Sequence, residues 1–393
     1  MGGEATIQRR QLAILASALV LSMSTWFSTA AVIGQLRDNW DLTRTSSSWL
    51  TIMVQLGFVG GAVLSATTNL ADRVPPRRLM LYGSLGAAAA NASIVVFDSY
   101  GLALGSRFVT GAFLAAVYPP ALKAMSAWYR TNRGFALGVM VGALTLGSAL
   151  PHLLNAIGSI EWEQTLMLTS VFTLGGGLLA TLAGSDGPHG VASAPFDPTQ
   201  LKAIVANREF RLASAGYFGH MWELYAMWAW IASFYGDVFS SVRSASLAAF
   251  VVIGVGAAGS VYAGSMSDRR SRPEAAGLAM RWSAALAAVI GFFVGAPWPL
   301  VLVLGLVWGF WVVADSAQFS TIVTEVTPPA YVGTALTVQL AAGFVLTVFT
   351  IFLVPVVVDA GGADSIGWGL AFLLLAPGPI LGALAMRALQ HRG

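Results

Sequence analysis

Twelve long apolar segments separated by short polar ones dominate the sequence of 393 residues. A helix needs about 20 mostly apolar residues to cross a membrane, and each segment reaches that length. The segments lie at 11–34, 49–70, 77–96, 100–127, 133–155, 164–183, 210–235, 245–265, 275–295, 298–322, 332–357 and 366–389. They are continuous and rich in Leu, Ala and Gly, without the alternation that is typical of transmembrane barrel strands. The sequence therefore predicts an all-α integral membrane protein.

Composition leads to the same conclusion and excludes several classes of function. Hydrophobic residues make up 56% of the chain and charged residues 10%, whereas soluble domains carry about 25% charged residues. The chain has no cysteine, which excludes disulfides, thiolate nucleophiles and cysteine-based metal sites. It also contains no phosphate-binding loop, no metal-spaced histidine cluster and no G-x-S-x-G motif. We therefore expect neither an enzyme nor a bound cofactor or metal, and no nucleic-acid partner.

The distribution of basic residues predicts the orientation in the membrane. With the N-terminus in the cytoplasm, seventeen of the 21 Lys and Arg residues fall on the cytoplasmic side or at cytoplasmic helix ends. Arg37, Arg44 and Arg243 fall outside, and Arg107 lies within a segment. Cytoplasmic loops of membrane proteins carry an excess of Lys and Arg. Both termini are therefore predicted to be cytoplasmic, in a multi-pass, monomeric protein surrounded by lipid in a bacterial inner (plasma) membrane.

The chain divides into two halves that repeat each other. Its longest polar segment, 184–208, separates six apolar segments in 1–183 from six in 209–393. Ala71-Asp72-Arg73 after the second segment matches Ser267-Asp268-Arg269 after the eighth, at an offset of 196 residues (267 − 71). Many transporters are built from two repeats with the substrate site between them near the bilayer midplane. We expect two pseudo-symmetric six-helix bundles joined by a cytoplasmic linker.

Three motifs carry a resemblance to a known family. NLADRVPPRRLML (69–81) resembles the signature of the loop between helices 2 and 3 in the major facilitator superfamily, and GSMSDRRSRP (264–273) is a weaker second copy. SRFVTGAF (106–113) is similar to the helix 4 signature of the same superfamily, with Arg107 and Gly111 in place. The resemblance implies the superfamily's fold, twelve helices in two bundles, and transport of a small molecule by alternating access.

The loop motif also predicts a cytoplasmic latch. Its aspartate can pair with basic residues or sit at a helix N-terminus, where the helix dipole favours an anion. The resemblance implies that such a latch stabilises the outward-open state. The residues expected to form it are Asp72, Arg73, Arg77, Asp268 and Arg269. The motif's basic residues also signal cytoplasmic topology, and the two interpretations are compatible.

Ionisable side chains at membrane depth are the first candidates for a functional site, because burying them in a bilayer is costly. His220, Glu223, Asp315 and Arg107 fall inside apolar segments. His152 lies near the outer end of its segment, where we expect it to face solvent. Burial disfavours the charged form of a carboxylate, so a buried one can load and release a proton. We expect Glu223 or Asp315 to carry a coupling proton and His220 to share it.

Helical periodicity predicts which side chains share a face with these groups. At about 100° per residue, the face of the seventh segment that we expect to line a central cavity carries His220, Glu223, Met227 and Trp230. Trp222, Tyr225 and Trp228 occupy the other face, which we expect to pack against helices or lipid. The other candidates for the cavity wall are Trp26, Gln55, Tyr118, Trp308, Trp311, Gln318 and Gln339. The alternative is that His220 and Glu223 form a structural hydrogen bond.

Glycine and proline residues indicate where helices come close or bend. Gly138, Gly142 and Gly147 are expected to permit close helix approach in the fifth segment. Tyr118-Pro119-Pro120 is expected to kink the fourth segment, because proline removes a backbone hydrogen bond.

Three classes of function remain open. The first is proton-coupled uptake of a small organic solute, or of a monocarboxylate or other anion bound with the help of Arg107 and His220. The second is proton-driven efflux of a cationic or amphipathic compound, which carboxylates and tryptophans can hold by charge and by cation–π contact. The third is a receptor that does not transport on a transporter scaffold.

The general look of the chain is distantly similar to nitrate- and cyanate-type porters and other anion or organic-acid porters. Nitrate porters carry an arginine in each of helices 2 and 8, whereas 49–70 and 245–265 contain no Lys or Arg. Drug antiporters carry G-x-x-x-G-P-x-x-G-G in helix 5, whereas this chain has GVMVGALTLGSALPHLL. Uptake is therefore favoured over efflux.

Overall fold

Every regular element in the described part of the chain is a helix. The computed structural model describes residues 2–158, 160–189 and 196–390. The first elements are α1 (Gly2–Ser22), the 3₁₀ helix η1 (Met23–Thr25), α2 (Ser28–Ala31), α3 (Ile33–Trp40), α4 (Arg44–Thr67), α5 (Leu70–Arg73), α6 (Pro76–Phe97), α7 (Tyr100–Leu114), α8 (Tyr118–Ser126), α9 (Arg133–Gly158) and α10 (Trp162–Leu182). The others are η2 (Pro198–Gln200), α11 (Leu201–Ala206), α12 (Arg208–Val238), α13 (Val242–Gly254), α14 (Gly256–Arg269), α15 (Arg272–Val289), η3 (Ile290–Phe293), α16 (Trp298–Val312), α17 (Ser316–Val326), η4 (Pro329–Tyr331), α18 (Val332–Gly361), α19 (Ser365–Leu373) and α20 (Pro377–Gln390). The predicted all-α class is confirmed.

Ten helical stretches of the described residues are long and apolar enough to cross a membrane. α1 and α12 are not among them, although α12 is 31 residues long. The middle of α12 carries His220, Glu223 and several tryptophans, all of which lower its mean hydropathy. The sequence prediction of twelve spans therefore stays a prediction.

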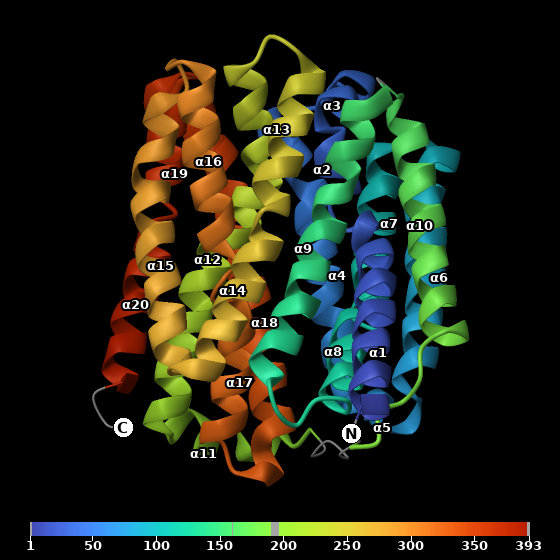
Figure 1. Cartoon of the computed structure of the whole chain (residues 1–393). Helices are drawn as coiled ribbons and strands as arrows, with labels where there is room; N and C mark the ends of the chain where they lie inside the picture. The colour runs from blue at the N-terminus through green and yellow to red at the C-terminus, as the bar shows by residue number, and fades with distance from the viewer. Residues whose placement is uncertain (1, 159, 190–195, 391–393) are drawn as a thin grey trace.

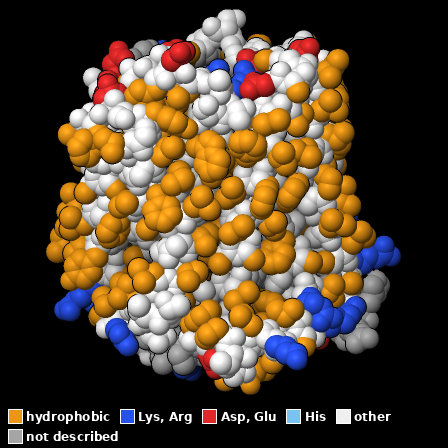
Figure 2. Space-filling model, turned by 180° about the vertical axis from the view of Figure 1, so that it is seen from behind, with side chains coloured by type: hydrophobic (Ala, Val, Ile, Leu, Met, Phe, Trp, Pro, Cys, Tyr) orange, Lys and Arg blue, Asp and Glu red, His pale blue; other side chains and the backbone are white. Residues whose placement is uncertain are grey.

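The outer surface carries a broad apolar band between two charged ends (Figure 2). Such a band is typical of a protein that spans a lipid bilayer. Lys and Arg side chains gather at the lower end in Figure 2, and α1 begins and α20 ends at that same end in Figure 1. The charge asymmetry thus agrees with the proposed orientation, while the cytoplasmic location of the termini stays a prediction.

The helices of residues 2–182 lie together on one side of the molecule and those of residues 201–390 on the other (Figure 1). We call the contact between these two groups the seam. Along it α9 packs against α13 and α14, and α4 packs against α18. The domain boundaries 1–183, 184–208 and 209–393 stay a prediction.

Glycines of α9 allow close packing, as expected. A Cβ added at Gly138 would lie 2.5 Å from the carbonyl oxygen of Ser260 in α14, across the seam. A Cβ at Gly147 would lie 2.5 Å from the carbonyl oxygen of Val20 in α1. Gly142 is also close to α14, with 3.1 Å between an added Cβ and the nearest carbonyl oxygen. The predicted close approach at these three glycines is confirmed.

Several of the predicted apolar segments are interrupted helices. α7 ends at Leu114 and α8 begins at Tyr118, which confirms the predicted kink at Tyr118-Pro119-Pro120. Several other interruptions were not predicted from the sequence, and two of them position candidate site residues. α1 gives way to η1 and α2 between Ser22 and Ser28, and α16 ends at Val312 before α17 begins at Ser316. These two breaks place Trp26 and Asp315 outside regular helix.

Candidate functional site

A buried histidine–aspartate pair connects α12 to the break between α16 and α17. His220 Nδ1 lies 2.8 Å from Asp315 Oδ1, and both side chains are almost fully buried. The rings of Tyr217 and Phe319 flank the imidazole, with centroids 6.3 and 5.6 Å away. The break after Val312 thus places a carboxylate next to the histidine that sequence analysis singled out.

Glu223 lies one turn after His220 on α12 and is buried as well. Its Oε1 accepts hydrogen bonds from Ser283 Oγ of α15 at 2.7 Å and from Trp308 Nε1 of α16 at 2.6 Å. We call His220, Asp315, Glu223, Ser283 and Trp308 the polar cluster. All five belong to the second group of helices, and His220 pairs with Asp315 rather than with Glu223.

The opposite face of α12 forms the seam. Trp26 of the α1 interruption stacks on Tyr225, with ring centroids 5.7 Å apart. Trp228 meets Phe27 edge-on at 5.7 Å and Tyr225 at 5.7 Å. The periodicity grouping holds only in part. Trp222, predicted to share a face with Tyr225 and Trp228, donates to the Leu374 carbonyl oxygen within the second half, and Trp230, predicted to share a face with His220 and Glu223, faces α4 across the seam. The face that meets the other half, however, carries Tyr225 and Trp228, while His220 and Glu223 turn into their own half.

Six rings make up this aromatic cluster at the seam. They are Trp26, Phe27 and Phe58 from the first half and Tyr225, Trp228 and Phe344 from the second. All six are almost fully buried. Phe58 and Phe344 lie 4.6 Å apart by ring centroid, so α4 and α18 close the cluster on a second side. The position that sequence analysis expected to be a cavity is filled by aromatic side chains in this conformation.

Arg107 is fully buried and lies apart from the polar cluster. Its guanidinium donates to the carbonyl oxygens of Thr25 at 2.8 Å, of Leu50 at 3.1 Å and of Trp26. It also donates to Asn91 Oδ1 at 3.1 Å and to Ser28 Oγ. An interrupted helix leaves carbonyl groups without helical partners. Arg107 supplies those partners and thereby holds the interruption that positions Trp26.

The serines of the interruption also help to hold it. Ser24 Oγ donates to the carbonyl oxygen of Leu21 at 2.8 Å, and Ser28 Oγ donates to that of Thr25 at 3.0 Å. Ser and Thr side chains that bond to the preceding turn tend to bend a helix. The run of Ser and Thr residues in 22–29 was the sequence signal for this break.

The remaining predicted wall residues are scattered. Gln55 is buried in α4 and Gln339 in α18, and neither amide atom of Gln55 has a hydrogen-bond partner among the described residues. Gln318 is buried in α17, and its Oε1 lacks such a partner too. Trp311 points away from the seam, because its ring packs with Tyr262 and Trp282, each about half exposed.

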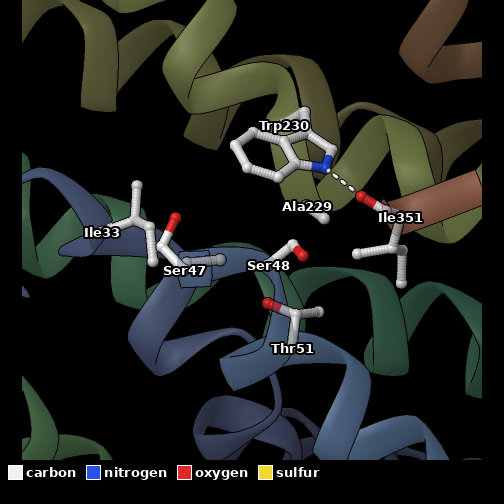
Figure 3. A pocket seen from close by; sticks show the side chains of 8 residues that line it. Ile33, Ser47, Ser48, Thr51, Ala229, Trp230 and Ile351 are labelled. Carbon is white, nitrogen blue, oxygen red and sulfur yellow. Dashed lines mark hydrogen bonds between the residues drawn. The ribbon is translucent and has the colours of Figure 1, made fainter. Parts of the chain in front are cut away.

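A small cavity lies at the seam near the aromatic cluster (Figure 3). Its volume is about 10 Å³, close to the minimum that a single water needs. Ser47, Ser48 and Thr51 of α4 face Ala229 and Trp230 of α12 across it. Trp230 Nε1 donates to the carbonyl oxygen of Ile351 in α18 at 2.9 Å. The indole N–H of Trp230 therefore already has a partner within the protein. That Trp230 contacts substrate in a central cavity stays a prediction.

Polar contacts join the two halves at both ends of the seam. At the upper end, Arg44 of α4 lies 3.8 Å from both Asp237 and Asp359, and its guanidinium sits over the ring of Trp368. At the lower end, Asp268 of α14 accepts hydrogen bonds from the backbone N–H groups of Gly134 and Phe135 in α9, each at 2.9 Å. Asp268 thus occupies a helix N-terminus, as the latch hypothesis expects of the motif's aspartate.

The other predicted latch residues are placed differently. Arg77 binds Asp186 through two bonds of 3.1 Å and so ties α6 to the chain after α10 within the first half. Arg73 and Arg269 are exposed. The side chain of Asp72 lies outside the described residues. A latch role for these four residues stays a prediction.

We expect Asp268→Asn to loosen the lower end of the seam. The charge–dipole interaction that it removes is worth about 0.3–1 kcal/mol, so the opening equilibrium should shift about two- to fivefold. The chain has no native cysteine, so Ser260→Cys, buried opposite Gly138, provides a single maleimide-labelling site. In Asp268→Asn the rate of maleimide labelling at this site should rise about two- to fivefold. Asp364→Asn is the matched control, because Asp364 caps α19 within the second half. An equal rate in both variants would contradict a latch.

The burial of three polar residues was not predicted from the sequence. His152 does not face solvent: it is fully buried, and neither ring nitrogen has a partner among the described residues. Asn155, one turn later, donates to the Ala31 carbonyl oxygen and to Ser246 Oγ across the seam, both at 2.9 Å. Asn91 accepts from Arg107. The sequence signal that could have identified these residues is an amide or imidazole side chain within an otherwise apolar helix.

The comparisons with known proteins agree with this architecture. The family model described as Major Facilitator Superfamily matches residues 14–272. The MFS-type transporter pynF of Aspergillus niger is 27% identical over 243 residues, which cover 59% of this chain and 54% of that protein. The match therefore spans about half the length of this relative.

Solved structures extend the similarity over the whole fold. A bacterial homologue of the human lysosomal transporter Spinster, in an inward-facing and occupied conformation, superposes with a TM-score of 0.72 at 15% identity, over 97% of this chain and 96% of that one. A D-xylose-proton symporter superposes with a TM-score of 0.73 at 14% identity, over 97% of both chains. At these identities the similarity shows a shared fold.

Proposed function

Because the chain belongs to the major facilitator superfamily, it is a multi-pass membrane transporter, and we propose that it takes up a small organic solute by alternating access with protons as the coupling ion. The superfamily resemblance found in the sequence is thereby confirmed, and so is the conclusion that the chain is not an enzyme. A closer relation to nitrate, cyanate or other anion porters stays a prediction. The identity of the substrate, the direction of transport and the coupling ion are proposals.

The observation that carries the proposal is the polar cluster. Two carboxyl groups and an imidazole, those of Asp315, Glu223 and His220, are buried together inside one half of the molecule. Ionisable groups at membrane depth are costly and mark ion or proton pathways. Buried titratable groups with a specific charged partner are also candidates for function in any fold. In the proposed mechanism a proton loads onto this cluster from one side and leaves it to the other.

The position of the cluster on α12 supports coupling to the seam. α12 carries His220 and Glu223 on one face and Tyr225 and Trp228 on the other. A change of charge at the His220–Asp315 pair alters the attraction between α12 and α17. Any resulting shift of α12 moves the aromatic side chains that contact Trp26 and Phe27 of the first half. Protonation and the opening of the seam are therefore linked through a single helix.

The hydrogen bonds of Arg107 help to decide whether the solute is an anion. Five oxygen atoms of the protein already accept hydrogen bonds from its guanidinium. An anion at Arg107 would have to displace these partners, which argues against the anion alternative. Efflux of a cation is the second candidate, and it would place Glu223 or Asp315 in contact with the cargo. Both carboxylates instead face their own half.

Purified protein in liposomes tests the proposal. A thermal-shift screen of small anions, amino acids, sugars, neutral organic solutes and organic cations selects a probe, since a ligand at a hundred times its dissociation constant stabilises by about 2.7 kcal/mol. The selected compound is then added outside liposomes that contain a trapped pH dye. We expect the lumen to acidify in step with uptake of the compound. Uptake with a constant lumenal pH would contradict proton coupling, and binding without any uptake would favour the receptor alternative.

A further inference from the structure

Two indole N–H groups in the aromatic cluster have no hydrogen-bond partner among the described residues. They are Nε1 of Trp26 and Nε1 of Trp228. Both side chains are fully buried, and Tyr225 links them, with 5.7 Å between its ring centroid and each of theirs. Buried polar groups in native proteins are almost always hydrogen-bonded, so an unpartnered pair requires an explanation. Other indoles of this chain, such as Trp222, Trp230 and Trp308, do have partners.

The two groups lie on opposite sides of the seam. Trp26 belongs to the interruption held by Arg107 in the first half, and Trp228 belongs to α12 in the second. Gln55 of α4 adds a third buried side chain whose amide lacks partners among the described residues, one turn before Phe58 of the same cluster. When the halves separate, the cluster divides between them and these groups face the space that opens. An orphan donor is then available to a ligand that enters.

The chemistry of these groups defines what they recognise. An indole N–H donates and does not accept, so its partner on the ligand must be an acceptor such as a carbonyl, ether or hydroxyl oxygen. The six rings offer flat apolar walls, which suit a flat apolar body. The ionisable groups nearby already have contacts. Arg107 donates to protein oxygens, His220 lies against Asp315, and Glu223 accepts from Ser283 and Trp308.

We infer that the substrate is an uncharged, flat and largely apolar molecule bearing acceptor oxygens, which receives hydrogen bonds from Trp26 and Trp228. The inference rests on the proposed transport function and narrows its substrate class. A cation would meet the positive ends of the indole N–H dipoles, and no carboxylate faces it among the described side chains of the cluster. An anion would be buried without a free positive partner, which is costly in a low-dielectric environment.

Four probes of similar shape separate these alternatives: benzamide, benzoate, benzylammonium and ethylbenzene. They share one ring and differ in charge and in the presence of an acceptor. Binding is measured by calorimetry on the purified protein at a fixed pH at which benzoate and benzylammonium are ionised. We expect benzamide to bind at least about tenfold more tightly than the other three, because only benzamide is neutral and also has a carbonyl oxygen. Preferential binding of benzoate or of benzylammonium would overturn the inference.

Substitution of the indoles gives a second measurement. Trp26→Phe and Trp228→Phe keep a ring and remove the N–H. Each should weaken benzamide binding about two- to tenfold, the range for loss of one neutral hydrogen bond. Trp222→Phe is the matched control, since its N–H already donates to the Leu374 carbonyl oxygen. It should leave benzamide binding unchanged and lower the melting temperature.

The outcomes separate this inference from the proposed function. If both substitutions leave benzamide affinity unchanged, the two N–H groups do not contact the ligand and the inference is wrong. If benzamide binds as expected but its uptake moves no proton, the inferred substrate class is supported and the proposed proton coupling is wrong. If benzoate is the preferred ligand and its uptake still acidifies the lumen beyond the entry of benzoic acid itself, coupling stands and the substrate class fails.

Discussion

Arg107→Met is expected to destabilise the protein strongly. The change removes the partner of three backbone carbonyl groups and of Asn91 and Ser28, all buried around the α1 interruption. A buried acceptor left without a donor costs about 1–3 kcal/mol. With partial rearrangement we expect a total loss of more than about 3 kcal/mol, which corresponds to a melting temperature lower by roughly 5–10 °C.

Thermal unfolding in detergent, followed by intrinsic fluorescence, measures this effect. Arg107→Lys should fall between wild type and Arg107→Met, because an ammonium group has three donors and lacks the planar geometry of guanidinium. Arg281→Met is the control, since Arg281 is an exposed arginine within α15. If Arg107→Met keeps wild-type stability but loses transport, Arg107 acts in coupling or gating, the role that the superfamily resemblance implied, rather than as the support of the α1 break.

Glu223→Gln is expected to abolish proton-driven accumulation while preserving the fold. The amide oxygen of Gln can still accept the hydrogen bonds from Ser283 and Trp308, so the polar cluster keeps its geometry. An amide does not bind a proton near neutral pH, so the variant loses this proton site. A membrane potential of 100 mV supplies about 2.3 kcal/mol per proton, which supports a concentration ratio of roughly 50-fold. In the variant this ratio should fall to about one.

The decisive comparison is between accumulation and counterflow at matched protein content. Counterflow needs only the binding and release of substrate on both sides, so it should survive in Glu223→Gln. Glu325→Gln is the control, because Glu325 pairs with Arg272 at the end of α17 and is half exposed. Wild-type accumulation in Glu223→Gln would show that Glu223 is only a structural acceptor and would leave the His220–Asp315 pair as the remaining proton site.

Much of the fold could be predicted from the sequence because it depends on local properties. The length and apolarity of each segment predict helices that span a lipid bilayer, the proline pair after Tyr118 predicts the end of α7, and Gly138 predicts a close helix contact. The loop motif at 69–81 and its copy at 264–273 identified the superfamily. Each of these signals lies within a few residues of the feature it predicts.

The candidate site depended on tertiary structure. Periodicity gives the angle between two residues of a helix but not the rotation of the whole helix about its axis, and both faces of α12 are rich in aromatic residues. The sequence therefore grouped His220 with Glu223 but did not show that Tyr225 and Trp228 meet the other half. The same holds for His152, whose burial depends on which helices surround it.

The sequence by itself predicted an all-helical membrane protein of the major facilitator superfamily with ionisable groups in its seventh and tenth segments. Tertiary structure alone decided the partners of those groups. Arg107 lies 82 and 57 residues from Thr25 and Leu50, whose carbonyl oxygens it binds, and His220 lies far along the chain from Asp315. The physical reason is that a buried charge is stabilised by whichever oppositely polarised atoms the packing brings within about 3 Å of it, and helix packing brings together residues that local sequence patterns do not connect.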